Sequence, residues 1–261
     1  MKRLLTVLFL VGCGGSDPAP KTENDAKPEA RQERTGPVPV VQQELGSIDE
    51  RAVQKTFFDL QSRTEKCHTL ARDRIEYLTG DVKTFMRIDA NGRVRYVYFE
   101  ETTLGDREAE KCILDVFSKA TWPKPVGGEA EVRNGFGWGP GGERAPASWG
   151  PEKVSSALAE KDTKKELDKC KSGVKGNVTV TAYVVHDDSP EPETHTSPGK
   201  KPPPKPKGKK GDSDKGGKFQ SLGVAVANKE AAEKIDCFVE ALKPVKLPDP
   251  GSYAAKVTFG L

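Results

Sequence analysis

The sequence predicts an α+β fold made of two tandem small modules, each with the order helix–strand–strand–helix–strand and a three-stranded antiparallel sheet. The main observation is an internal repeat, because segment 110–138 recurs in modified form as 233–261. In both copies a cysteine is followed ten residues later by a large apolar residue, then by Pro-x-Pro, glycine and a closing Phe-Gly-apolar sequence. Composition agrees, since 34% hydrophobic residues with 26 Gly and 20 Pro disfavour one large core in 261 residues.

Residues 1–12 are expected to be a signal peptide, because a basic start precedes an apolar run too short to span a bilayer. Leu10-Val-Gly-Cys13 resembles the bacterial lipobox, in which the cysteine is diacylated and becomes the mature N-terminus. An ordinary secretory signal with an incidental cysteine is the alternative. In such signals, glycine at position 14 in place of aspartate favours the outer membrane, facing the periplasm. Residues 13–46 then form a lipidated, disordered tether that needs no transmembrane helix.

The first module is expected to cover 47–138 and to open with a helix. Ser47-Ile-Asp-Glu50 has the pattern of a capping box, with serine at the N-cap and glutamate three residues later. Apolar residues then recur at helical spacing until the helix ends before Gly80. These residues are Val53, Phe57, Leu60, Cys67 and Leu70.

Two strands, a second helix and a third strand complete this module. Val82, Thr84, Met86 and Ile88 alternate with Lys83, Phe85 and Arg87, and a turn at 89–92 leads to the returning strand. The second helix opens at 104–106, carries one apolar stripe and ends before Pro123, since proline cannot continue a helix. The closing strand, 129–138, places three large apolar side chains on one face: Val132, Phe136 and Trp138.

The second module is expected to cover 151–261, after a linker at 139–150. A helix from Pro151 to Cys170, strands from Val178 and from Leu222, a helix capped by Asn228 and a closing strand repeat the first order. In place of the tight turn, however, segment 188–218 is rich in lysine and proline and is expected to be a disordered insert. A solvated loop and a contact with envelope polyanions are both open. The lysines available for such a contact include Lys200, Lys201, Lys205, Lys207, Lys209 and Lys210.

Four cysteines follow Cys13, and an even number in an exported protein favours disulfides over metal or redox chemistry. In each copy the first cysteine ends the first helix and the second lies within the second helix. This symmetry predicts the pairs Cys67–Cys112 and Cys170–Cys237. Closing loops of this size stabilises a fold by roughly 4 kcal/mol on the chain-entropy model.

The combination of Gly-x-Val, Asn-Gly-x-Val, a cysteine-bearing helix, Trp-Pro-x-Pro-x-Gly-Gly and a terminal aromatic strand resembles the TonB C-terminal domain, and more closely its cysteine-paired AgmX/PglI type. The resemblance covers Ile48–Trp138 and, more loosely, Pro151–Leu261. It implies a non-enzymatic module that docks on envelope proteins, in TonB by adding a strand to a partner's sheet. A lipobox in place of an N-terminal membrane helix argues against energy transduction.

The candidate partner edge is the closing strand of the first module, with Arg133, Phe136 and Trp138, because open strand edges invite strand addition. A purely structural role for both aromatic residues is the alternative.

Other chemistry is poorly supported by the sequence. A net charge of +3, from 42 basic and 39 acidic residues, points to no particular polyanion, and nucleic acid is not expected for an exported chain. Neither a metal nor a cofactor is predicted. A loose metal site at His186 with His195, and a nucleophile at Cys67 beside His68, are weaker hypotheses, the latter excluded if Cys67 forms a disulfide.

The expected function is therefore that of an envelope lipoprotein acting as an adaptor or scaffold, held to the membrane by its lipid, in a complex such as one for motility or transport. An enzyme or inhibitor with a cryptic site and a polyanion binder are the alternatives.

Overall fold

The computed structural model describes residues 45–188 and 216–261, all of which belong to one contact-defined unit, Gln43–Leu261. The expected signal peptide, lipidation site at Cys13 and most of the tether lie outside the described residues. So does most of the insert, including its six candidate lysines: Lys200, Lys201, Lys205, Lys207, Lys209 and Lys210.

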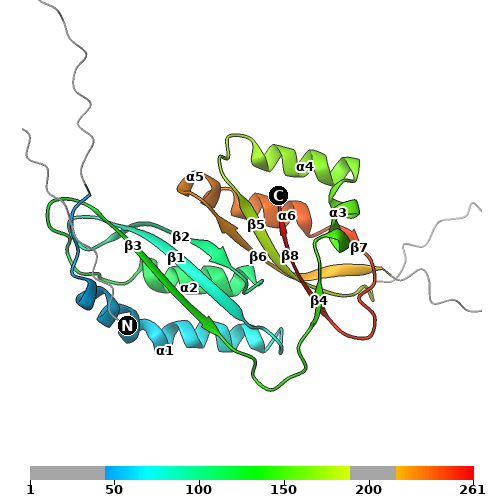
Figure 1. Ribbon diagram of the computed structural model, residues 1–261, viewed down its shortest axis with the longest axis horizontal. Helices are drawn as coiled ribbons and strands as arrows, with labels where there is room; N and C mark the ends of the chain where they lie inside the picture. The colour runs from blue at the N-terminus through cyan, green and yellow to red at the C-terminus, as the bar shows by residue number, and fades with distance from the viewer. Residues whose placement is uncertain (1–44, 189–215) are drawn as a thin grey trace, which may run out of the picture. The chain divides into compact units, whose positions relative to one another are not determined.

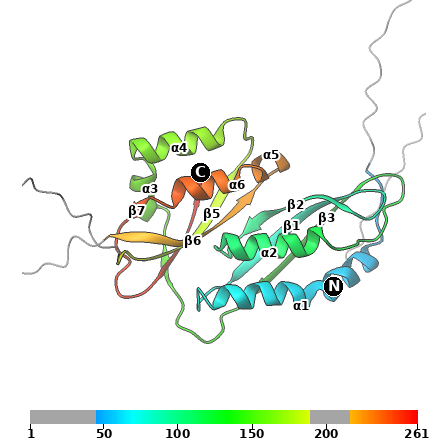
Figure 2. The ribbon, with the colours of Figure 1, turned by 180° about the vertical axis from the view of Figure 1, so that it is seen from behind.

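The first half of the described chain forms a three-stranded antiparallel sheet, as predicted, with the strand order β2-β1-β3. Both helices lie on one face of this sheet (Figures 1 and 2), where they bury Val82, Met86 and Val132. The elements are α1 (Glu50–Arg72), β1 (Gly80–Ile88), β2 (Val94–Thr102), α2 (Arg107–Ser118) and β3 (Ala130–Trp138).

The start of α1 differs from the prediction. Asp49, not Ser47, is the N-cap, and its carboxylate accepts hydrogen bonds from Arg51 N at 2.9 Å and Ala52 N at 3.2 Å. Aspartate caps a helix at least as well as serine. Ser47 is used elsewhere, because its backbone forms an antiparallel bridge with Val126. The predicted capping box is therefore wrong, and the N-cap lies two residues later in the sequence.

The second half repeats the order of helices and strands but builds a larger sheet. Its five strands have the order β4-β8-β5-β6-β7, so the predicted three-stranded sheet is wrong for this half. The additional strands are β4, which pairs in parallel with β8, and β7, which pairs with β6. The strands are β4 (Ala147–Trp149), β5 (Val178–His186), β6 (Gly217–Val226), β7 (Lys246–Leu247) and β8 (Ala255–Gly260). Because β4 lies inside 139–150, that segment is not only a linker.

Each helix expected in the second half is divided into two: α3 (Glu152–Leu158) and α4 (Lys161–Lys171), then α5 (Lys229–Ala232) and α6 (Ile235–Leu242). The first break has a geometric reason. Val154 and Leu167 are both buried in the same core, yet on one straight helix they would lie about 140° apart at 100° per residue. A break before Lys161 lets both side chains face the sheet.

One disulfide joins two helices in each half, in the pairing that the repeat predicts. Cys67–Cys112 links α1 to α2, and Cys170–Cys237 links α4 to α6. Both half-cystines on the longer helices, Cys67 and Cys170, are buried. Each disulfide therefore clamps a helix pair over its own sheet.

The two halves also share packing. Phe85 and Tyr98 point away from α1 and α2, and both are buried in the core of the second half. Tyr183 of β5 in turn belongs to the core of the first half and donates a hydrogen bond to Thr79 O at 3.1 Å. The alternation of apolar and polar residues in β1 would leave the face of Phe85 exposed. Phe85 is buried there because the second half covers part of that face.

We expect the double substitution Cys67→Ala/Cys112→Ala to lower the free energy of unfolding by roughly 4 kcal/mol, because the disulfide closes a loop of 45 residues. Urea unfolding of the variant and of the parent chain measures the difference. The matched variant Cys170→Ala/Cys237→Ala, with a separation of 67 residues, should lose a similar amount. An unchanged midpoint in either variant would contradict a stabilising role for that disulfide.

Candidate functional site

Strand β3 is the edge of the first sheet that is left open. Among the described residues it pairs along its length only with β1. The opposite edge strand, β2, lies beside β6 and α5 of the second half, and its Tyr98 hydroxyl donates to Ala227 O at 3.5 Å. The open edge of the first sheet is therefore the one that the sequence analysis selects.

Alternate residues of β3 direct their backbone groups outward. In an antiparallel strand the N–H and C=O of one residue point to the same side. Asp81 faces Gly137 across the β1–β3 register, but its carbonyl accepts from Thr103 N, on the side of β2. Gly137 therefore directs its own backbone groups away from β1. The unbroken register gives the same direction to Gly135, Arg133 and Glu131.

The start of β3 supports this assignment. Glu129 has the same parity as Arg133, and its carbonyl accepts a hydrogen bond from Gly46 N, outside the sheet, at 2.8 Å. The chain that leads into α1 thus already pairs with the outer side of this segment, just before the strand begins. Beyond Glu129, along β3 itself, no strand of the described chain occupies the edge.

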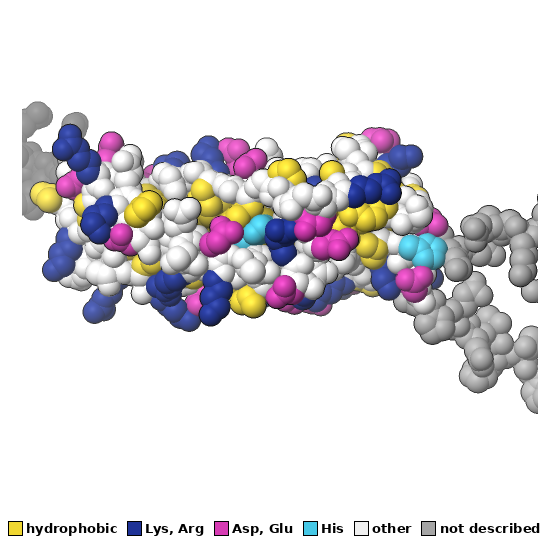
Figure 3. Space-filling model, turned by 90° about the horizontal axis from the view of Figure 1, so that it is seen from below, with side chains coloured by type: hydrophobic (Ala, Val, Ile, Leu, Met, Phe, Trp, Pro, Cys, Tyr) yellow, Lys and Arg dark blue, Asp and Glu magenta, His cyan; other side chains and the backbone are white. Residues whose placement is uncertain are grey.

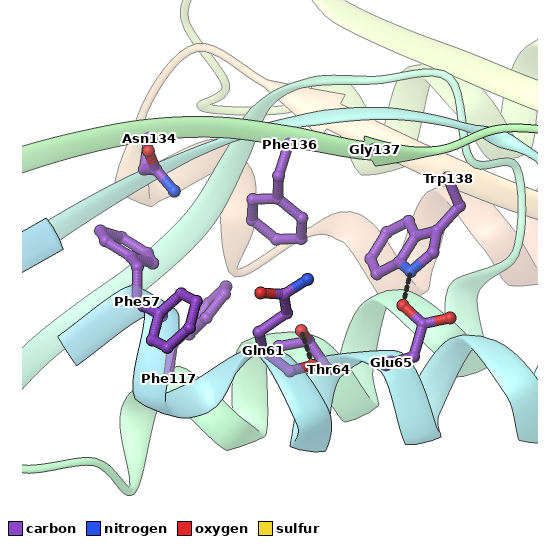
Figure 4. Close-up of a pocket in the computed structure, with 10 residues that line it drawn as sticks. Phe57, Gln61, Thr64, Glu65, Phe117, Asn134, Phe136, Gly137 and Trp138 are labelled. Carbon is purple, nitrogen blue, oxygen red and sulfur yellow. Dashed lines mark hydrogen bonds between the residues drawn. The ribbon is translucent and has the colours of Figure 1, made fainter. Parts of the chain in front are cut away.

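A groove between β3 and α1 follows the edge on one face of the sheet (Figure 4). Its volume is about 290 Å³. Phe136 and Trp138 point from β3 toward the helix, where Gln61, Thr64 and Glu65 form the opposite wall. Phe57, Phe58 and Phe117 add further aromatic surface, and Phe58 is 75% exposed. The groove can therefore accept an apolar side chain from solvent.

Trp138 is held in a defined orientation at one end of this groove. Its Nε1 donates to Glu65 Oε2 at 2.8 Å, and its ring stacks on His68 with centroids 4.8 Å apart. Burial lowers the pKa of His68, and its Nε2 lies 3.0 Å from Leu78 O. A neutral, fixed imidazole provides a flat support for the indole.

Phe136 contacts both aromatic neighbours edge to face, Phe117 at 5.7 Å and Trp138 at 5.3 Å. Phe136 and Trp138 are only partly buried, whereas Val132 on the same strand is 6% exposed. The two aromatic residues thus pack on the core and also line the groove, so neither of the two sequence-based interpretations is excluded.

Arg133 lies on the other face of the sheet. It is exposed, and its guanidinium lies 4.5 Å from the centroid of the Phe85 ring. It also pairs with Glu100 at 3.0 Å and with Glu131 at 3.3 Å. The side chain is thus engaged within the chain, while its backbone N–H points outward.

A second hollow, of about 700 Å³, lies on the Arg133 face. Glycines at 135 and 137 leave this side of β3 without side chains, and the Lys83–Glu101 ion pair lies at its rim. Both hollows share Asn134, Phe136 and Gly137. The stretch 134–137 is therefore flanked by space on each face, as an added strand with alternating side chains requires.

The equivalent strand of the second half is not available in the same way. The first three residues of its closing strand β8 pair with β4, namely Ala255, Lys256 and Val257. Figure 3 shows the face of the molecule seen from below, where hydrophobic side chains are scattered among acidic and basic ones. The site thus depends on one open edge with its adjoining groove.

Two of the weaker hypotheses, a nucleophile at Cys67 and a metal site at His186, concern residues that the structure describes. Cys67 is in a disulfide, so no thiol is left beside His68. His186 lies near two carboxylates, with Nδ1 3.1 Å from Asp249 and Nε2 3.6 Å from Asp188. The part of the chain that the structure describes contains no group of three or more His, Cys, Asp or Glu residues arranged to hold a metal ion.

Sequence reasoning missed the α1 wall of the groove. The sequence pattern places Phe57 among the apolar residues at helical spacing and gives no role to Phe58 beside it. An aromatic residue that lies beside the apolar stripe of a helix indicates a side chain that faces a groove. Phe58 is such a residue in α1. Glu65 carries no such signal, because its hydrogen bond to Trp138 joins residues 73 positions apart.

Comparison with protein-family models, with curated proteins and with solved structures finds no match for this chain. Of the helices in the described ranges, none combines the length and the apolar character that crossing a membrane demands.

The two glycines of β3 should differ in their tolerance of a side chain. A Cβ at Gly135 would meet only Val82 O, at 3.7 Å, which is an ordinary contact. A Cβ at Gly137 would lie 2.1 Å from Asp81 Oδ1 and 2.9 Å from Gly80 O. We expect Gly137→Ala to destabilise the fold by about 1–3 kcal/mol and Gly135→Ala to change it by about 0.5 kcal/mol or less. Equal urea midpoints for the two variants would contradict the register described above.

Proposed function

We propose that the chain is a non-enzymatic binding protein that takes an extended segment of a partner protein onto the open edge of β3. The observation that carries this proposal is the outward direction of the backbone at Glu131, Arg133, Gly135 and Gly137, next to hollows on both faces of the strand. The engagement of Arg133 with Glu100 and Glu131 keeps its side chain off the incoming backbone.

Main-chain and side-chain contacts would contribute differently to such binding. Each backbone hydrogen bond adds about 0.5–1.5 kcal/mol net and carries no sequence information. An apolar side chain buried in the groove beside Phe136 would add about 1.5–3 kcal/mol. Successive side chains of a strand alternate between faces, so the preferred ligand has apolar residues at every second position and small or polar residues between them.

The setting of this activity is also part of the proposal. We infer that Cys13 is lipidated and holds the protein at the outer membrane, facing the periplasm, and that the two halves are copies of one module. The resemblance to the TonB C-terminal domain of the AgmX/PglI type supports strand addition to an envelope protein. Because β4 pairs with part of β8 in the second copy, we assign this role to the first copy and propose that the second is a scaffold.

A pair of proline substitutions tests the edge. Arg133→Pro removes an outward N–H, so it should spare the β1–β3 ladder and change the melting temperature by only a few degrees. Asn134→Pro removes an inward N–H and should destabilise the first half strongly. A peptide selected from a random displayed library on the full chain serves as the ligand. Its dissociation constant, measured by calorimetry, should rise about tenfold or more in Arg133→Pro, which corresponds to about 1.4 kcal/mol.

The matched variant Gly135→Val fills the second hollow without touching a backbone donor, and it should also weaken the peptide. If the peptide binds both folded variants, Arg133→Pro and Gly135→Val, as tightly as the parent chain, the ligand site lies elsewhere. Equal loss of stability in Arg133→Pro and Asn134→Pro would show that β3 has no free side.

Lipidation has a separate test. Cys13→Ala should yield a protein that lacks the lipid mass and leaves the membrane fraction, because a thioether-linked diacylglycerol is the expected anchor. Fractionation of cells expressing the variant and the parent chain, with mass spectrometry of each, measures both effects. A variant that still fractionates with the outer membrane would overturn the lipobox interpretation.

A further inference from the structure

A buried carboxyl group joins the two halves of the described chain. Glu110 of α2 is 0% exposed. Thr102 Oγ1, in the same half, donates to its Oε1 at 2.9 Å. Val224 N, in β6 of the second half, donates to its Oε2 at 3.0 Å. One side chain thus receives a hydrogen bond from each sheet, and neither the groove nor the open edge of β3 uses it.

The backbone closes tightly around this carboxyl group. A Cβ at Gly223 would lie 2.3 Å from Glu110 Oε1 and 2.9 Å from Gly105 Cα. Gly105 itself has a φ of 78°, a left-handed conformation that favours glycine. Ser221 Oγ donates to Gly105 O at 2.8 Å beside it. The contact therefore depends on two glycines that let β6 approach the start of α2.

The charged groups around Glu110 come from three elements, and none forms a hydrogen bond to it in the described contacts. On its own helix are Asp106, which is the N-cap, and Arg107. From the segment after α1, Arg74 pairs with Asp106 at 2.9 Å. From α6, Asp236 pairs with Arg107 Nε at 3.0 Å and with Nζ of Lys111, the residue after Glu110 on α2, also at 3.0 Å. The two packed strands contribute only the Thr102 hydroxyl and the Val224 N–H.

Arg107 is placed to change partners. It is three residues before Glu110 on α2, so the two side chains lie on the same face of the helix. Its Nη1 is buried and makes no hydrogen bond within the described part of the chain. An uncompensated N–H of this kind is unfavourable, and an ionised neighbour would satisfy it.

We propose that Glu110 is a pH-sensitive latch between the two halves. The neutral carboxyl holds β6 against α2, whereas the ionised carboxyl attracts Arg107 away from Asp236 and thereby loosens the contact of β6 with α2. The loosening concerns the junction at Val224 and leaves each disulfide-clamped half folded.

Burial sets the direction of the pH dependence. Desolvation raises the pKa of Glu110 to about 8, against the opposing effect of its two hydrogen bonds. An acid whose pKa is higher in the folded state stabilises the contact fully below its unfolded value, near 4.5, and loses that stabilisation as the pH rises through about 8. The latch is therefore closed at pH 6 and weakened at pH 9.

Lys256 titrates in the same pH range, but its titration has the opposite effect on the stability of the fold. Its Nζ donates to Thr79 O at 2.7 Å, and burial lowers its pKa to about 8. A lysine whose folded pKa is lowered makes the fold more stable as the pH rises through that value. A loss of protection with rising pH therefore cannot come from Lys256.

The test is the protection factor of the Val224 amide against hydrogen exchange, measured by NMR on the oxidised chain between pH 6 and pH 9. In the parent chain we expect it to fall at least tenfold across this range, while amides in the centre of β1 keep theirs. Glu110→Gln keeps the shape and removes the ionisation, so its Val224 protection should be independent of pH. Asp236→Asn frees Arg107 and should move the midpoint of the loss to lower pH.

Two results would overturn the latch. One is a parallel fall in the parent chain and in Glu110→Gln, or no fall in either. The other comes from direct titration of the ¹³C-labelled Glu110 carboxyl in the parent chain, which needs no variant to fold: a midpoint near 4.5 in place of one near 8 would exclude the neutral carboxyl.

Discussion

The packing of β6 against the outer face of the first sheet is the contact on which the other features depend. It buries Phe85 and Tyr98 on the side of the sheet that α1 and α2 leave uncovered. Two aromatic side chains of this size are worth several kcal/mol of buried apolar surface. With helices on one face and β6 on part of the other, the edge at β3 is the side of the first sheet that no strand of the described chain covers.

This arrangement separates the roles of the two halves. In the proposed function, the second half presents β3 and blocks other routes of approach, because β4 pairs with part of its own closing strand and β6 lies beside β2 of the first half. A small sheet with a helical layer alone would expose one whole face, and a partner could then approach in many orientations. Restricting access to one edge favours a ligand in extended conformation.

The sequence predicts the local features well, because they depend on neighbours along the chain. The start of the second helix at 104–106, the turn after Ile88 and the disulfide pairs follow from residue type, spacing and the repeat, and the structure contains them. The cap at Asp49 shows the limit of this reasoning, since two acceptable capping residues compete and a backbone bridge to Val126 decides between them.

Features that depend on distant contacts were not predictable in the same way. The three residues of β4 show no periodicity, and they form a strand only because β8 offers an edge to them. The alternation of β1 identifies two faces but does not say that β6 covers the second, which is why Phe85 was not expected to be buried. At the candidate site, the sequence indicates the strand and its aromatic residues, whereas the wall at Glu65 requires the fold.

The hairpin of β5 and β6 determines how the chain can lengthen. Asp187 N donates to Gly216 O at 2.9 Å, and His186 faces Gly217, so the two ends of the insert start from adjacent points of one ladder. The ladder fixes the distance between these two ends, so it sets no requirement on the length of the chain that joins them. Each doubling of such a loop costs only about 0.6 kcal/mol in closure entropy. Evolution can therefore lengthen, shorten or recompose the insert almost independently of the rest of the protein, and the same position is suited to carry an affinity tag or a reporter domain.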